Sequence, residues 1–250
     1  MAGPGEPLTR DLRGTLQAAA SGEGGGLRHG LWLSFLGPYG LEVVIGGGAD
    51  WLGVDLQHGN LELRDLPGLL RVAEPAGLPV LARAPSHDPA VISRILDTGV
   101  SGVIIPMVES AEQARALVAA CRIPPHGDRS TGGCRSTLGV SHAPDLPLLL
   151  AMVETAPGLD HANDILGVPG VDGVFFGPYD LSISAGYPAP DSSQTVEALR
   201  RVITLARSAG KIAGFMAGRP ELRAVAPEAD LVAVDTDVSA LRLGLAEILT

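Results

Sequence analysis

Short, almost continuously hydrophobic segments recur along the chain and are separated by more polar stretches. They lack the strict alternation of hydrophobic and polar positions that a half-exposed strand has, which favours strands covered on both faces, as in a parallel sheet. We expect eight such strands, at Leu31–Ser34, Trp51–Asp55, Val80–Arg83, Val103–Ile105, Leu148–Val153, Gly173–Phe176, Ile212–Phe215 and Leu231–Val234.

Segments with helical periodicity lie between these strands. Hydrophobic residues repeat at the spacing of one helix face over 66–73, 92–99, 114–121 and 199–206. Ser110 and Gln113 have the spacing of a capping box, which predicts that a helix begins just after the fourth strand. Three glycines stand where helices are expected to end before the next strand, namely Gly77, Gly99 and Gly210.

Eight strands alternating with helices in 250 residues is typical of a (β/α)8 barrel, the TIM barrel, in a single domain. The alternative is an open, doubly wound sheet, which normally has a glycine-rich turn after its first strand. Here the three glycines at 46–48 precede the second strand instead. We therefore predict a flexible lead over residues 1–26, which is rich in Gly, Ala and Glu, and a barrel domain over residues 27–250.

Composition and charge exclude several function classes. With 28 acidic and 18 basic residues the net charge is −10, so a nucleic-acid partner is not expected. The sequence has no hydrophobic run of membrane-spanning length and no signal-peptide pattern, which indicates a cytoplasmic protein without membrane association. Cys121 and Cys134 do not have the spacing of a metal site. Lys211 is the only lysine, so a Schiff-base mechanism would have to use it.

Two carboxylates follow directly after strands, where barrels carry their reactive groups. Glu154 follows the fifth strand and Asp180 the sixth. Together they could hold a hard divalent cation that takes its other ligands from water and a keto acid. The alternative is structural, with Glu154 capping the next turn and Asp180 serving as an N-cap. Trp32, at the end of the first strand, either borders the pocket or belongs to the core.

The second and third strands end in a further polar group. Asp55 could orient the ring of His58 and raise its basicity, which would make His58 a general base. The alternative is a histidine satisfied by the backbone. Arg83 at the barrel mouth requires an anionic partner, which is either a substrate carboxylate or a protein carboxylate such as Asp55 or Glu154.

Taken in order, these residues resemble the HpcH/HpaI aldolase family, the metal-dependent class II pyruvate aldolases that include 2-dehydro-3-deoxyglucarate and 4-hydroxy-2-oxoheptanedioate aldolases. The resemblance covers about Gly30 to Gly186 well and the rest more loosely. Its motifs are Gly30-Leu31-Trp32, Asp50-Trp51, Asp55-x-x-His58-Gly59, Arg83-Ala84-Pro85, Leu96-Asp97-x-Gly99-x-x-Gly102-x-x-x-Pro106, Pro124-Pro125-x-Gly127-x-Arg129, Val153-Glu154-Thr155 and Gly177-Pro178-x-Asp180-Leu181-Ser182.

The resemblance implies a carbon–carbon lyase that cleaves or forms 4-hydroxy-2-oxo acids, with pyruvate as the enolate donor or product and an aldehyde as the other substrate. It implies that Glu154 and Asp180 hold a divalent metal, which is Mg²⁺, Mn²⁺ or Co²⁺. It also implies a homo-oligomer, a hexamer in which helices are exchanged between neighbours.

The same resemblance assigns roles to the remaining site residues. His58, oriented by Asp55, takes the proton, and Arg83 stabilises the enolate oxygen. Backbone amides of the turn from Gly177 to Tyr179 bind the carboxylate of the keto acid, and Trp32 borders the pocket.

Two departures from the family pattern keep other functions open. Many relatives have glutamate where this chain has Gln57, and Ser130 replaces a usual glycine. One alternative is a decarboxylase or another carbon–carbon bond-forming enzyme that uses the same metal–enolate site. The other is a catalytically silent barrel that binds a keto acid or a partner protein. An imine mechanism is disfavoured in every case, because Lys211 begins the seventh strand and is expected at the opposite face of the barrel.

Overall fold

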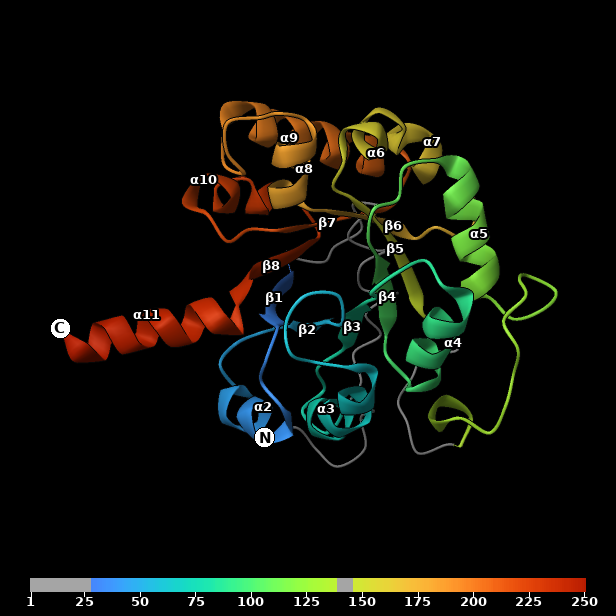
Figure 1. The fold of residues 1–250 in the computed structure, drawn as a ribbon, viewed down its shortest axis with the longest axis horizontal. Helices are drawn as coiled ribbons and strands as arrows, with labels where there is room; N and C mark the ends of the chain where they lie inside the picture. Colours follow the sequence, from blue (N-terminus) through green and yellow to red (C-terminus); the bar gives the residue numbers. More distant parts are fainter. Residues whose placement is uncertain (1–27, 139–145) are drawn as a thin grey trace.

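The fold is a closed barrel surrounded by helices, as the computed structural model of the chain shows (Figure 1). The structure describes residues 28–138 and 146–250, so the predicted lead over 1–26 lies outside the described residues. All neighbouring strands pair in parallel and in chain order, and the last strand pairs with the first. The predicted (β/α)8 barrel is confirmed.

The strands lie close to where the hydrophobic pattern predicts them. They are β1 (Arg28–Leu33), β2 (Trp51–Asp55), β3 (Val80–Arg83), β4 (Gly102–Ile105), β5 (Leu148–Val153), β6 (Gly173–Phe176), β7 (Ile212–Met216) and β8 (Leu231–Thr236). The bounds of β2, β3, β5 and β6 coincide with the prediction, and those of the others differ by one to three residues.

Helices of very different length cover the barrel. The α-helices are α2 (Pro38–Val44), α3 (Leu66–Ala73), α4 (Pro89–Asp97), α5 (Ala111–Cys121), α6 (Ala156–Asp160), α7 (Ala162–Leu166), α8 (Pro178–Ser184), α9 (Ser193–Ser208), α10 (Pro220–Arg223) and α11 (Asp237–Leu249). Short 3₁₀ turns are η1 (Leu63–Asp65), η2 (Arg135–Thr137) and η3 (Ala226–Glu228). The four periodic segments correspond to α3, α4, α5 and α9.

The predicted helix ends are confirmed as well. The Ser110 hydroxyl accepts a hydrogen bond from the backbone N–H of Gln113 at 3.2 Å, which caps α5. Gly77, Gly99 and Gly210 have φ values of 69°, 91° and 63°, the left-handed conformation that commonly ends a helix.

The continuous hydrophobic runs are explained by burial on both faces of each strand. In β5, Leu148, Leu150 and Met152 belong to the core inside the barrel. The residues that alternate with them, Leu149 and Ala151, pack instead in the layer between strands and helices. Because both faces are buried, hydrophobic residues occupy every position and no alternation is visible in the sequence.

Two tryptophans fill the interior of the barrel. Trp32 stacks on Phe175 with ring centroids 5.5 Å apart, and Trp51 meets the same ring edge-on at 6.4 Å. A Cβ on Gly30 would lie 2.1 Å from the Trp51 ring, and one on Gly53 would lie 2.3 Å from the Trp32 ring. These two glycines therefore provide the space that the indole rings occupy.

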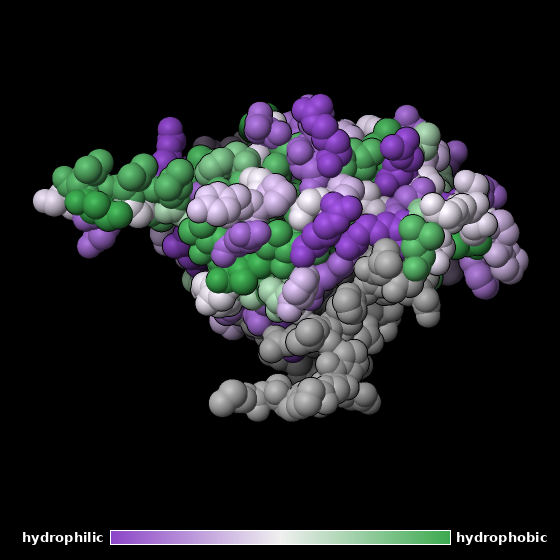
Figure 2. Space-filling model, turned by 90° about the horizontal axis from the view of Figure 1, so that it is seen from below, coloured by the Kyte–Doolittle hydropathy of each residue, from purple (hydrophilic) through white to green (hydrophobic). Residues whose placement is uncertain are grey.

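The last helix, α11, leaves the barrel instead of packing on it (Figure 1). Its exposed hydrophobic side chains include Leu243, Ile248 and Leu249, which are 64%, 79% and 80% exposed. Figure 2 shows hydrophobic residues gathered over this projecting arm. Within the described residues no helix combines the length and the apolar character needed to cross a membrane.

Candidate active site at the carboxyl end of the barrel

A cavity of about 270 Å³ opens at the carboxyl ends of the strands. Most of the predicted site residues line it, together with residues from the ends of β7 and β8. The lining comprises Trp32, Ser34, Asp55, His58, Arg83, Met152, Phe175, Gly177, Pro178, Tyr179, Asp180, Met216, Gly218, Asp235, Thr236 and Ser239. Glu154 lies next to this wall, because a Cβ on Gly177 would stand 2.8 Å from its Oε2 atom.

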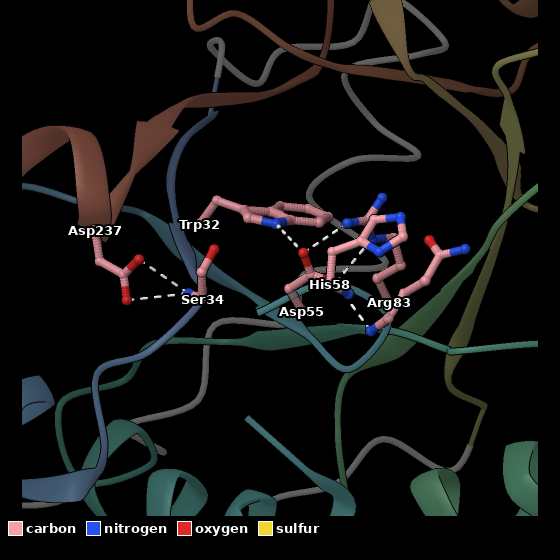
Figure 3. A network of polar contacts seen from close by, with 7 residues as sticks. Trp32, Ser34, Asp55, His58, Arg83 and Asp237 are labelled. Carbon is pink, nitrogen blue, oxygen red and sulfur yellow. Dashed lines mark hydrogen bonds and ion pairs between the residues drawn. The ribbon is translucent and has the colours of Figure 1, made fainter. Parts of the chain in front are cut away.

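Arg83 is held by Asp55 in a two-point ion pair (Figure 3). Its Nε atom donates to Oδ1 at 2.9 Å and its Nη2 atom to Oδ2 at 2.5 Å. Both side chains are buried, and Trp32 completes the group by donating from Nε1 to Oδ2 at 3.3 Å. The guanidinium carbon also lies 5.4 Å from the centroid of the indole ring. Of the partners considered for Arg83, the structure therefore selects Asp55.

The surroundings of Asp55 keep it ionised. Burial by itself raises the pKa of this carboxyl, but the Arg83 guanidinium and the backbone N–H groups of His58 and Gln57 lower it by more. The net effect is a pKa below the ordinary value for an aspartate. An ionised Asp55 fixes the position of the positive charge of Arg83 at the cavity wall.

His58 lies exposed at the cavity, one turn beyond the end of β2. The Asp55 carboxylate accepts a hydrogen bond from the backbone N–H of His58 at 3.1 Å. Asp55 thus holds the chain segment that carries the histidine, and its contact with His58 runs through the backbone. We expected Asp55 to orient the imidazole ring of His58. Within the described residues Asp55 bonds the backbone of His58 and makes no hydrogen bond with the ring.

Glu154 is a buried carboxylate with one oxygen bonded and one free. Its Oε1 atom accepts from the backbone N–H of Met107 at 2.9 Å, whereas Oε2 is buried and has no hydrogen-bond partner among residues 28–138 and 146–250. Burial raises the pKa of Glu154 to about 7, and the nearby charges of Asp180 and Asp55 contribute to the increase. An unpartnered buried oxygen is costly unless a ligand satisfies it.

Met107 adopts a strained backbone conformation next to this carboxylate. Its φ of 53° is the only positive value of a non-glycine residue in the described parts of the chain. A side chain in this left-handed region costs about 1–3 kcal/mol, and such strain concentrates at functional sites. The conformation is the one in which the Met107 N–H reaches Glu154 Oε1.

The structural alternatives for Glu154 and Asp180 do not hold. Thr155, rather than Glu154, caps the following helix, because its hydroxyl accepts from the backbone N–H of Gly158 at 3.1 Å. Gly177 is the N-cap of α8, and Asp180 lies exposed in the first turn of that helix. Both carboxylates are therefore available to a ligand.

These carboxylates fit a divalent cation that is bound partly by other ligands. The oxygen of Glu154 without a partner is the kind of hard donor that Mg²⁺ and Mn²⁺ take, and Asp180 is close enough to raise its pKa. The described residues contain no group of three or more candidate metal-ligating side chains. A cation here would need further ligands from substrate and water.

The turn after β6 offers fewer backbone donors than the sequence suggests. The Gly177 N–H already donates to the Val153 carbonyl at 3.1 Å, and Pro178 has no N–H group. Tyr179 has its backbone in the first turn of α8 and its side chain at the cavity. What Gly177 contributes is space, since any side chain there would collide with Glu154.

Two of the family-like motifs serve the scaffold rather than the cavity. Arg129 donates to the Asp97 carboxylate at 2.7 Å, which ties the segment after α5 to the end of α4.

Lys211 also lies away from the site, and its Nζ atom donates to the Val168 carbonyl, ahead of β6, at 2.9 Å. The expectation that this lysine sits at the opposite face of the barrel is confirmed.

Part of the cavity wall was missed in the sequence. Asp235, Thr236 and Ser239 line it from the end of β8 and the start of α11. The signal was present, because Asp235 follows a hydrophobic strand directly, as Glu154 does. Ser34 contributes from the end of β1. The backbone N–H of Ser34 donates to the Asp237 carboxylate at 2.9 Å. No local sequence pattern reveals this contact, because the two residues lie far apart in the chain.

Buried ionised groups gathered at the carboxyl end of a closed (β/α)8 barrel are the arrangement of a barrel enzyme. Comparisons with known proteins identify the kind of enzyme. Residues 28–239 match the family model of the HpcH/HpaI aldolase/citrate lyase family. The chain belongs to this family, and it is a carbon–carbon lyase of the aldolase type.

Individual relatives agree with this assignment. The hydroxypyruvate/pyruvate aldolase of Delftia acidovorans is 38% identical over 226 residues, which cover 86% of this chain and 84% of that protein. The 2-keto-3-deoxy-L-rhamnonate aldolase of Escherichia coli K12 is 38% identical over 229 residues, 85% of this chain and 84% of that protein. A crystal structure of a family member from Burkholderia cenocepacia superimposes with a TM-score of 0.84 at 29% identity, and covers 97% of this chain and all of that one.

Proposed function

We propose that this enzyme is a divalent-metal-dependent aldolase that cleaves and forms 4-hydroxy-2-oxo acids, with pyruvate as the shared donor or product and an aldehyde as the other substrate. The observation that carries the proposal is the unpartnered Oε2 atom of Glu154, which is buried beside Asp180. A buried carboxylate oxygen without a donor is expected where a cation binds.

In this proposal Glu154 and Asp180 hold the cation, which is Mg²⁺ or Mn²⁺, with Co²⁺ as a further candidate. When bound, the cation supplies Lewis acidity to the carboxylate and keto oxygens of the 2-oxo acid. Gly177 leaves space beside Glu154, and Trp32 and Tyr179 border the keto acid from two sides of the cavity.

Arg83 stabilises the negative charge that develops on the keto oxygen. Its Nε and Nη2 atoms are engaged by Asp55, and within the described residues its Nη1 atom makes no hydrogen bond. Because the guanidinium is locked in place before the reaction, no reorganisation is needed as the charge forms. Asp55 positions Arg83 and the backbone of His58.

His58 moves the proton. In the cleavage direction it accepts the proton of the C4 hydroxyl, directly or through a water molecule. The C3–C4 bond then breaks, its electron pair passes to the enolate of pyruvate, and the aldehyde leaves. A proton is returned to C3 and pyruvate is released.

The projecting helix α11 supports the further proposal of a homo-oligomer, a hexamer, in which α11 packs on a neighbouring copy. Leu241 and Leu245, 53% and 47% exposed, belong to the hydrophobic set on this helix. An isolated hydrophobic helix in water is unfavourable, and its burial on a second copy removes that cost. The cytoplasmic location stays a prediction of the sequence.

A pyruvate-release assay tests the proposal. We expect several 4-hydroxy-2-oxo acids to be cleaved in the presence of Mg²⁺, Mn²⁺ or Co²⁺, and EDTA to abolish the activity. Activity that persists in EDTA would exclude the metal-dependent reaction. Pyruvate from oxaloacetate alone would favour the decarboxylase, and no pyruvate despite confirmed metal binding would favour the silent barrel.

A further inference from the structure

The cavity has two chemically different sides. One carries Arg83, Asp55 and Asp180, which the proposed reaction uses. The other lies at the ends of β7 and β8, where Gly218, Asp235, Thr236 and Ser239 line it and the Tyr179 side chain reaches it from α8. None of these last residues except Tyr179 has a part in the proposed chemistry.

We propose that this second side, the β8 wall, binds the hydroxyl groups of a neutral, hydroxylated aldehyde. The proposal rests on the aldolase function above, because it assigns the substrate that reacts with the pyruvate enolate. It names the chemical class of that aldehyde, whereas the metal and keto-acid site is common to every aldehyde the enzyme accepts.

Asp235 supplies hydrogen-bond acceptors to the wall. Its Oδ1 atom accepts from the backbone N–H of Thr236 at 2.8 Å, and its Oδ2 atom accepts from Arg223 at 2.8 Å. Each carboxylate oxygen accepts more than one hydrogen bond, so both retain capacity for a ligand. An ionised carboxylate donates nothing and therefore selects a ligand O–H group.

Ser239 supplies a donor next to it. The Thr236 hydroxyl donates to the Ser239 hydroxyl oxygen at 3.2 Å and accepts from the Ser239 backbone N–H at 3.1 Å. Because the Ser239 hydroxyl accepts this hydrogen bond, its own O–H group is available as a donor, and Ser239 lines the cavity. A hydroxyl group of a ligand meets both an acceptor and a donor on this wall.

Gly218 keeps the wall open between its polar groups. A Cβ at this position would lie 3.2 Å from the Tyr179 hydroxyl oxygen and 3.7 Å from Asp235 Oδ1. The space beside Gly218 is therefore flanked by a phenol and a carboxylate. A small hydroxylated chain fits such a space better than a purely hydrocarbon one, which would make no hydrogen bond with either group.

The charge of the wall decides between neutral and anionic aldehydes. Asp235 lines the cavity, whereas its partner Arg223 is not among the lining residues. A second carboxylate on the aldehyde would be placed against Asp235 and repelled. The wall thus favours an uncharged hydroxyaldehyde over an aldehyde that carries an acid group.

The test measures aldol addition of pyruvate to three aldehydes in the presence of Mg²⁺ or Mn²⁺. Glyceraldehyde is neutral and hydroxylated, propionaldehyde lacks hydroxyl groups, and 4-oxobutanoate is anionic. We expect the wild type to have a kcat/KM for glyceraldehyde at least about tenfold above those for the other two. Exchange of the pyruvate methyl protons in D₂O, which needs no aldehyde, measures the enolate chemistry separately.

Ser239→Ala and Asp235→Asn should each lower kcat/KM for glyceraldehyde about tenfold and leave propionaldehyde and methyl exchange unchanged. Asp235→Asn should also raise the activity with 4-oxobutanoate several-fold. Asp160→Asn, an exposed aspartate on α6, is the matched control and should change none of these values.

The outcomes separate the two proposals. Normal methyl exchange without any preference for glyceraldehyde, or with a preference that both variants retain, overturns the assignment of the β8 wall alone. Absence of both methyl exchange and aldol addition overturns the proposed aldolase. If Asp235→Asn fails to fold because Arg223 loses its partner, Ser239→Ala still decides, since Ser239 is not part of that ion pair.

Discussion

The Asp237 carboxylate holds the backbone just after β1, because its Oδ1 and Oδ2 atoms accept a hydrogen bond from the N–H of Ser34 at 2.9 and 3.0 Å (Figure 3). It accepts the next two backbone N–H groups, of Phe35 and Leu36, at 3.0 Å each. The carbonyl of Ser34 in turn accepts the N–H of Asn60, two residues from His58. One buried carboxylate therefore joins the start of α11 to two loops of the active site.

We expect Asp237→Asn to destabilise the protein by about 1–3 kcal/mol, because an amide cannot replace a carboxylate that accepts several N–H groups. Chemical denaturation measures the free energy of unfolding, and Asp160→Asn is the matched control at an exposed position. An unchanged stability would mean that the backbone at Ser34 to Leu36 holds its shape without this carboxylate.

Removing Arg83 should harm both catalysis and stability. Arg83→Ala leaves Asp55 buried and unpaired, which costs about 3–5 kcal/mol, and removes the positive charge from the keto oxygen. We expect kcat to fall about 100-fold or more in the pyruvate-release assay, with metal binding retained. A variant that keeps its kcat would remove Arg83 from the proposed mechanism.

The ion pair also predicts a pH dependence. The pKa of Asp55 is lower in the folded protein than in the unfolded chain, chiefly because Arg83 overcomes the effect of burial. The pair therefore stabilises the fold fully above the unfolded pKa of about 4 and loses this contribution as the pH falls further. Wild type and Asp55→Asn should differ in unfolding free energy at pH 7 and converge toward pH 3. A constant difference would contradict the assignment.

In the metal-free protein, Glu154 should make the unfolding free energy depend on pH in the opposite direction. Burial raises its pKa to about 7, so the folded state binds a proton more tightly than the unfolded chain does. The metal-free protein is then destabilised as the pH rises from about 4.5 to above 7, and Glu154→Gln removes that penalty. Thermal unfolding in EDTA at pH 5 and pH 8 measures the effect.

Metal binding should compete with protonation of the same group. Titration calorimetry with Mn²⁺ in two buffers of different ionisation enthalpy should detect proton release near pH 6, which disappears at pH 8.5. Glu154→Gln should bind the cation at least about tenfold more weakly. Unchanged affinity in this variant would show that the cation does not use Glu154.

The single lysine allows a clean test of the mechanism. Lys211→Met should retain aldolase activity, since the amine donates to the Val168 carbonyl away from the site. Borohydride added with pyruvate should not inactivate the wild type, because no imine forms. Inactivation by borohydride, absent in Lys211→Met, would overturn the metal-dependent route.

The hydrophobic surface of α11 predicts the behaviour of the assembly. Leu245→Asp together with Ile248→Asp should reduce the molar mass measured by light scattering, because two charges cannot be buried in the proposed contact. Val43→Asp on α2, where Val43 is 71% exposed, is the control and should leave the mass unchanged. A wild type that is monomeric at every concentration would exclude the hexamer.

The barrel was predictable because each strand is buried on both faces, which leaves a continuous hydrophobic signal in the sequence. The ends of the same hydrophobic runs placed Asp55, Arg83 and Glu154 at the ends of strands. Helical periodicity did not predict the short helices α6 and α7, because they have too few residues to display a period. The projection of α11 away from the barrel was not predicted either, because beyond its first turn the hydrophobic side chains of this helix are exposed and do not pack on the barrel.

By itself the sequence determined the eight-stranded barrel, the edge of that barrel where the reactive groups gather, and the exclusion of its only lysine from that edge. These follow from local periodicity and from the direction that parallel strands impose on their ends. Only the tertiary structure decided that Asp55 is committed to Arg83, that Glu154 keeps an oxygen without a partner, and that Asp235 and Ser239 complete the cavity. These depend on which side chains from distant strands come within hydrogen-bonding distance, and that is set by closure of the barrel and not by any local pattern.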